Sequence, residues 1–181
     1  MNRVKFRHDV SYLRRWFISF IIIDGYNLIG IQRGDLKRHR EMLIESLIAY
    51  RQKKGHDITA VFDGWKTGEG REMHSVVGGV RVIYTRIGEK ADAVIKRIIS
   101  SVKREWIVVS ADREIADHAW AAGSIPVAAE DFLQALERSG NIGIHDELAE
   151  DVDDSSVCRR KGNPRQLSRK RRAVARALSK L

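Results

Sequence analysis

Three aspartates that follow apolar runs are the residues whose types and spacing best suit chemistry. They are Asp24 after Ile21–Ile23, Asp63 after Ala60–Phe62, and Asp112 shortly after Ile107–Val109. Runs of β-branched and aromatic residues at this density predict strands that are buried on both faces. A carboxylate is costly inside such a strand, so each aspartate is expected at or beyond a carboxyl end. Ligands of open α/β sheets bind just outside these ends, so the three side chains are predicted to share one edge.

A fourth acid, Asp92, lies at the start of a predicted helix. Each aspartate also has a plain structural interpretation. Asp92 suits a helix N-terminus, where its charge is worth a few tenths of a kcal/mol. The pair Asp63-Gly64 suits a turn, and Asp112 suits a helix cap. Considered one at a time, Asp92 and Asp63 are better explained by their structural roles. For Asp112 the structural and functional interpretations are equally favoured. Their conjunction favours a shared acidic site, whereas Asp117 is expected to face elsewhere.

Gathered carboxylates predict a bound metal ion. Two carboxylates about 4 Å apart repel each other by about 4 kcal/mol at an effective dielectric near 20. Such a cluster takes up either protons or a divalent cation. Oxygen ligands without a Cys or His set favour Mg²⁺ or Mn²⁺ over Zn²⁺. A metal held by a few aspartates, with open positions for water and phosphate, is suited to hydrolysis of phosphodiesters.

Four further residues flank the predicted acidic site. Asn27 suits either a metal-bound water or a brace for the turn, and the brace is slightly favoured. Ser110 suits either a phosphate contact or a cap of its own turn. Arg86 and Lys90 flank the start of the Asp92 helix. They are candidates for holding the substrate backbone.

The predicted elements alternate between strands and helices. Strands are expected at 16–23, 58–62, 76–84 (whole or broken at Gly78-Gly79), 106–109 and 124–127. Helices are expected at 35–54, 91–103, 112–121 and 130–138, and residues 24–33 are expected to be a loop. This alternation indicates βαβ units. The predicted fold is a three-layer α/β sandwich whose mainly parallel central sheet is flanked by helices.

The charge of the chain is concentrated at its end. The net charge is +9, but ten Lys or Arg lie between Arg159 and Lys180, which leaves 23 basic against 24 acidic residues before them. A basic tail on a near-neutral body suggests a polyanionic partner, with nucleic acid favoured over an anionic membrane. A helix at Ser168–Leu181 would carry the candidate contacts Arg169, Lys170, Arg171 and Arg172. The alternative is a merely solvated tail.

These features divide the chain into four expected parts. Residues 1–15 form a loose leader, 16–139 the main domain, 140–160 an acidic linker or peripheral segment, and 161–181 the basic tail. The longest apolar run, from Trp16 to Ile23, is far shorter than the roughly 20 residues of a membrane span. The one cysteine, Cys158, fits a reducing compartment such as the cytoplasm. The oligomeric state is not indicated.

Four ordered motifs resemble the NYN domain, and more closely its YacP-like bacterial branch. They are Asp24-Gly25-Tyr26-Asn27, Val61-Phe62-Asp63-Gly64, Lys90-Ala91-Asp92-Ala93 and Ser110-Ala111-Asp112. The resemblance covers roughly Ile18–Arg138 and implies a PIN-like fold with a metal-dependent acidic site that acts on RNA. It also implies that the four aspartates are the acidic residues, with Asn27 as their polar partner, and that the protein associates with ribosomes. Lys90 departs from the family, in which Thr is common before Ala-Asp.

The sequence therefore predicts a metal-dependent endoribonuclease. A non-catalytic RNA- or ribosome-binding module of the same fold is the main alternative, although binding RNA alone would not favour four carboxylates. A phosphatase acting on small phosphate esters shares the metal chemistry. It lacks support because Tyr26 stands where an Asp-x-Asp nucleophile pair would place its second aspartate.

Overall fold

The computed structural model describes residues 18–30, 35–64, 70–140 and 168–181. Its elements in chain order are β1 (Phe20–Asp24), α2 (Gly25–Ile29), α3 (Leu36–Lys54), β2 (Asp57–Phe62), β3 (Met73–Val77), β4 (Val80–Tyr84), α4 (Ala91–Ser101), β5 (Trp106–Val109), α5 (Arg113–Ala121), β6 (Ile125–Val127), α6 (Ala129–Arg138) and α8 (Arg169–Lys180). The predicted leader, the acidic linker beyond residue 140, residues 161–167 of the basic tail and Cys158 lie outside the described residues.

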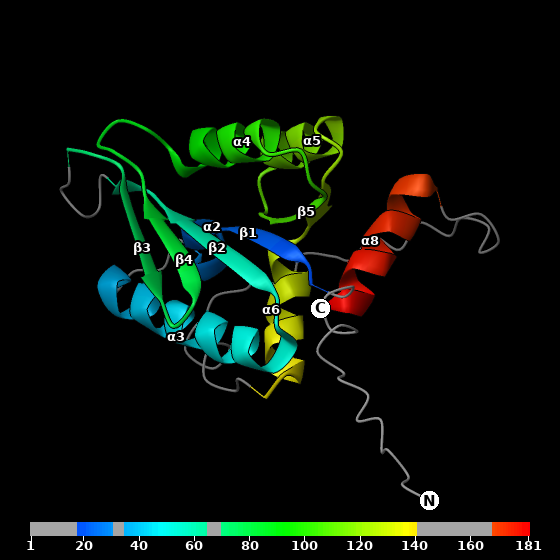
Figure 1. Cartoon of the computed structure of the whole chain (residues 1–181), viewed down its shortest axis with the longest axis horizontal. Coiled ribbons are helices and arrows are strands. Elements are labelled where there is room, and N and C mark those ends of the chain that lie inside the picture. The colour runs from blue at the N-terminus through cyan, green and yellow to red at the C-terminus, as the bar shows by residue number, and fades with distance from the viewer. Residues whose placement is uncertain (1–17, 31–34, 65–69, 141–167) are drawn as a thin grey trace, which may run out of the picture.

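The strands form one six-stranded sheet in the order β3-β4-β2-β1-β5-β6. All neighbouring strands are parallel except β3 and β4, which pair antiparallel. Helices α3 and α6 cover one face, and α4 and α5 cover the other (Figure 1). In the central strand, Ile21 and Ile23 pack toward α3 and α6 while Ile22 packs toward α4 and α5. This confirms the predicted three-layer α/β sandwich.

Two segments differ from the expectation. The predicted loop at 24–33 contains the short helix α2, because the side chain of Asp24 accepts a hydrogen bond from the Asn27 N–H and caps it. The predicted strand at 76–84 is a hairpin of β3 and β4. Gly78 and Gly79 have φ angles of 55° and 86°, a left-handed turn that glycine adopts easily. The strand expected at 16–23 is also shifted: β1 begins only at Phe20 and extends one residue beyond the expected end, to Asp24.

Helix α8 packs against the domain at the edge where the strands begin (Figure 1). Ala177 and Leu181 are buried in the core shared with α3 and α6. The Tyr50 hydroxyl donates to the Leu181 carbonyl at 2.7 Å, and the His56 Nε2 lies 3.1 Å from the Lys180 carbonyl. Tyr50 lies near the end of α3 and His56 immediately precedes β2. These contacts therefore hold α8 at the edge where the strands begin, opposite to Asp24.

No helix in the described part of the chain is long and apolar enough to cross a membrane.

Candidate active site at the carboxyl edge of the sheet

Asp24 ends the central strand at the point where the chain changes direction across the sheet. Strand β1 pairs with β2 on one side and with β5 on the other. The connection from β1 to β2 runs through α3 on one face, whereas β4 leads to β5 through α4 on the opposite face. Connections that part to opposite faces leave a ligand-binding crevice outside the carboxyl ends of the strands. Asp24 lies at this switch point.

The carboxyl of Asp24 is in an environment that disfavours its negative charge. Its pKa is raised from 3.8 to about 6. Burial is the largest cause, and the charges of Asp63 and Asp92 also raise this pKa, whereas hydrogen bonds with Asn27 lower it. Asp112 is not among the charges that raise this pKa. Since both neighbouring acids act on Asp24, the structure brings three of the four predicted acids to one edge. The negative potential there favours binding of a cation.

Asp63 and Asp92 lie on either side of the start of α4. The Asp63 Oδ1 accepts a hydrogen bond from the Ala91 N–H at 2.6 Å, so this carboxylate caps α4. The Asp92 Oδ1 accepts from the Ala93 N–H at 2.7 Å, and its Oδ2 lies 3.4 Å from the Lys96 Nζ. The helix N-terminal role considered for Asp92 is therefore present, whereas Asp63 caps α4, a role different from the turn with Gly64 that was considered for it.

A hydrogen-bonded bridge joins Asn27 to the loop that carries Asp112. The Asn27 Nδ2 donates to the Ser110 Oγ at 3.2 Å, and its Oδ1 accepts from the Ala111 N–H at 3.2 Å. The Ser110 Oγ also accepts from the Asp112 N–H at 3.0 Å. Asn27 thus braces the ends of β1 and β5 against each other, and Ser110 caps its own turn.

Asp112 faces solvent at the start of α5. Its Oδ1 accepts a hydrogen bond from the Glu114 N–H at 2.7 Å, which makes it the N-cap of that helix. Because this bond occupies one oxygen, the other oxygen of the carboxylate remains available to a ligand at the same edge.

The four acids fit a hard divalent cation in type and in charge, since carboxylate oxygens are its preferred ligands. The raised pKa of Asp24 is the observation that favours such an ion. Within the described residues, however, no three Asp, Glu, His or Cys side chains are grouped so that they could already hold a metal. Side chains that now cap helices would have to turn toward a shared ion.

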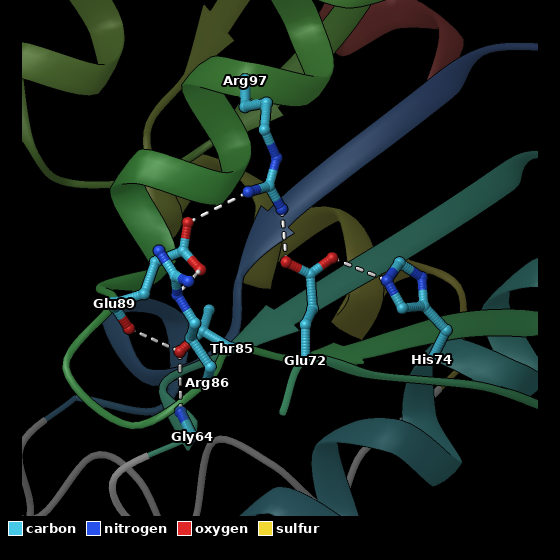
Figure 2. Close-up of polar contacts among 7 residues, drawn as sticks. All are labelled: Gly64, Glu72, His74, Thr85, Arg86, Glu89 and Arg97. Carbon is cyan, nitrogen blue, oxygen red and sulfur yellow. Dashed lines mark hydrogen bonds and ion pairs between the residues drawn. The ribbon is translucent and has the colours of Figure 1, made fainter. Parts of the chain in front are cut away.

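A buried threonine that the sequence reasoning missed positions the Asp63 loop. Thr85 is fully buried, and its Oγ1 accepts from the Gly64 N–H at 2.8 Å and donates to the Glu89 carbonyl at 2.6 Å (Figure 2). One hydroxyl therefore ties the residue after Asp63 to the segment that leads into α4. A threonine at a strand end gives no sequence signal that distinguishes this role.

Charged side chains extend this network from α4 to the hairpin. The Arg97 guanidinium bonds to Glu89 at 3.0 Å and also to Glu72, whose other oxygen lies 2.6 Å from the His74 Nε2 (Figure 2). These pairs are largely exposed, so each is worth about 1 kcal/mol or less. Their effect is to fix the α4 N-terminus relative to β3.

The predicted substrate contacts lie in two separate places. Arg86 pairs with Glu89 at 3.2 Å through its Nε and remains 65% exposed, and Lys90 is exposed at the N-cap of α4. Both are therefore at the acidic edge. The other four are in the first turn of α8, at the opposite edge, and are Arg169, Lys170, Arg171 and Arg172.

The parallel sheet, its helical layers and the acids at its carboxyl edge define a PIN-like nuclease fold. A model of the YacP-like NYN domain matches residues 21–177, and the chain belongs to that family, whose members are generally nucleases. The match extends into α8, beyond Arg138, where the resemblance in the sequence motifs ends.

Two crystal structures of Rae1 (YacP) from Bacillus subtilis share the fold. A tryptophan-to-leucine mutant has 24% identity and a TM-score of 0.55, over 69% of this chain and 79% of that one. The other has 22% identity and a TM-score of 0.53, over 69% and 77%. No curated protein matches the sequence.

Proposed function

We propose that this protein is a divalent-metal-dependent endoribonuclease whose acidic edge hydrolyses phosphodiester bonds of RNA. The observation that carries the proposal is the Asp24 carboxyl, which ends the central strand beside the charges of Asp63 and Asp92. An acid placed where burial and two like charges oppose its ionisation is not explained by stability. A bound cation would compensate all three charges.

Asp24, Asp63, Asp92 and Asp112 would hold Mg²⁺ or Mn²⁺, which when bound polarises the phosphate and activates water. The protein itself supplies the placement of these groups. Asn27 and Ser110 fix the distance between the ends of β1 and β5. Thr85 holds the Asp63 loop against α4. Arg86 and Lys90 would hold the RNA backbone at the same edge, because guanidinium and ammonium groups bind phosphate.

The test is cleavage of a labelled single-stranded RNA by the full chain, with Mn²⁺ or Mg²⁺ and with EDTA. Internal cleavage with either metal, and its loss in EDTA, is the expected result. Undiminished cleavage in EDTA would contradict the proposed metal dependence.

The alternative is a non-catalytic RNA- or ribosome-binding module, and one observation favours it. The carboxylates of Asp63 and Asp112 already cap helices, and no described cluster forms a ready metal site. RNA binding without any cleavage in the same assay would support this function. The family resemblance supports the ribosome as the place of action, and the single Cys158 supports the cytoplasm, for either function.

We further propose that the basic start of α8 binds RNA at a distance from the acidic edge. Its first turn carries four positively charged side chains, where the helix dipole disfavours positive charge. These side chains therefore do not stabilise the helix itself. Two of them, Arg169 and Arg172, line a hollow of about 610 Å³ together with Ala175 and Arg176. The five residues of β1 separate the two edges by about 17 Å. Only longer RNAs would therefore reach both.

Substituting Arg169, Arg171 and Arg172 by Gln tests the proposed role of α8. The slope of the logarithm of the RNA-binding constant against the logarithm of salt concentration reports the number of phosphate contacts. Loss of three contacts should reduce this slope by about 2 for single-stranded RNA. The fold should keep its stability within about 0.5 kcal/mol, because these side chains are exposed. Deleting the tail would be a poorer test, since Ala177 and Leu181 are buried. A salt slope equal to that of the wild type, or an equal loss in Lys103→Gln, would reject the role.

A further inference from the structure

Arg40 occupies a position of α3 where the helical pattern calls for an apolar residue. Leu36, Leu43 and Leu47 mark the face of α3 that packs on the sheet, and Arg40 falls on the same stripe at i+4 from Leu36. Its side chain is partly buried. A local pattern broken in this way is expected at functional sites.

Two tyrosines hold the Arg40 guanidinium at the carboxyl edge of the sheet. Its Cζ lies 5.3 Å from the centre of the Tyr84 ring, and its Nη1 makes a long contact of 3.5 Å with the Tyr26 Oη. Tyr26 and Tyr84 each pack on Phe62, the last residue of β2, with ring centres 5.3 and 5.7 Å apart. Because Tyr26 follows Asp24 by two residues and Asp63 follows Phe62, Arg40 lies beside the acidic edge.

The charge of Arg40 has no anionic partner in the described part of the chain. Its two contacts are a phenol hydroxyl and an aromatic ring, and it forms no ion pair with a described carboxylate. A partly buried guanidinium without a counter-ion costs free energy, whereas an apolar side chain there would not. Packing alone therefore does not account for an arginine at this position.

We propose that Arg40 binds a phosphate of the RNA next to the one that is cleaved, with Tyr26 and Tyr84 as positioning residues for its guanidinium. This inference rests on the proposed nuclease function. The N–H groups of a guanidinium lie in one plane, and those of Arg40 that the two tyrosines leave unoccupied suit paired hydrogen bonds to phosphate oxygens. The strand of RNA would then cross the acidic edge on the side of α3.

The test compares Arg40→Met with Arg51→Met in the full chain. Arg51 lies on the same helix, three turns further on, where it contacts the Gly78-Gly79 turn at the other end of α3. Met is apolar and close to Arg in length. Short single-stranded RNA binding is measured with each variant in an Asp24→Asn background, and KM and kcat in the active protein.

Arg40→Met should weaken RNA binding and raise KM about tenfold, with kcat within about threefold. Its stability to urea should be unchanged or higher, because the apolar stripe becomes continuous. Arg40→Lys should recover only part of the affinity, since the planar fork is lost. Arg51→Met should leave RNA binding within about twofold, because its charge lies away from the site.

Unchanged RNA binding in Arg40→Met, an equal loss in Arg51→Met, or a loss of stability that matches the loss of affinity would overturn the role of Arg40. Each of these outcomes leaves the nuclease proposal standing if the wild type cleaves RNA. A wild type that neither binds nor cleaves RNA would overturn both.

Discussion

Asp24→Asn is expected to lower metal-dependent RNA cleavage by about a hundredfold to a thousandfold, the range for losing one preorganised charge from an active site. Asn keeps the size of the side chain and still caps α2, so the fold is preserved. What it removes is the negative charge that the neighbouring Asp63 and Asp92 make costly. The measurement is single-turnover cleavage of a labelled RNA with Mn²⁺.

The same variant is expected to be more stable than the wild type when metal is removed. In the folded protein the pKa of Asp24 is about 6, above its ordinary value of 3.8. Protonation therefore favours folding, and the penalty for the charged form is absent below about pH 4 and complete above pH 6. The rise in the pKa of Asp24 corresponds to at most about 3 kcal/mol. We therefore expect Asp24→Asn to increase the free energy of unfolding by about 1–3 kcal/mol at pH 7.5.

Urea unfolding in EDTA at pH 7.5 and at pH 4 measures this gain. The difference between Asp24→Asn and wild type should shrink as the pH falls, because the wild-type carboxyl then becomes neutral as well. Asp117→Asn is the control, since Asp117 is an exposed acid on α5. It should change cleavage and stability little. Asp24→Asn with full activity, or with lower stability at pH 7.5, would contradict the assigned role of Asp24.

Gly64→Ala is expected to cause the largest loss of stability, about 3 kcal/mol or more. A Cβ at Gly64 would lie 1.4 Å from the backbone carbonyl oxygen of Thr85, and a backbone atom cannot turn aside as a side chain can. The loop would have to move, breaking the bond from the Gly64 N–H to the Thr85 hydroxyl. RNA cleavage should fall as well, because Asp63 is the preceding residue.

Gly70→Ala is the matched control for this substitution. No described atom lies within 4 Å of a Cβ built at Gly70, so its effect should be within about 0.5 kcal/mol. Chemical unfolding of both variants measures the difference. Equal stability of Gly64→Ala and Gly70→Ala would show that the Asp63 loop is not fixed as described.

The strands were predictable because each buried one is an apolar run that ends at a polar residue. The runs before Asp24, Asp63 and Ser110 gave β1, β2 and β5 within about one residue at their carboxyl ends. Helix α2 was missed because five residues are too few for a helical period to show. The hairpin of β3 and β4 was not predicted, because the glycine pair in the sequence suits a break in one strand as well as a turn between two.

The site was predictable in composition but not in geometry. Strand-end position predicted that Asp24, Asp63 and Asp112 share an edge. The raised pKa of Asp24 supports the neighbourhood of Asp24 and Asp63 and adds Asp92, which lies in the first turn of α4. Sequence spacing could not show that Asp63 reaches the backbone of Ala91, or that Thr85 joins two loops. Arg40 was missed because its partners, Tyr26 and Tyr84, come from other elements. Only the fold brings them together.

The most direct test of the central claim is a crystal of the full chain soaked in Mn²⁺, with anomalous diffraction used to locate the ion. We predict a Mn²⁺ peak within about 2.5 Å of a carboxylate oxygen of Asp24, with Asp63, Asp92 or Asp112 as a second ligand. An edge free of Mn²⁺, with these carboxylates still turned to the helix ends, would contradict it.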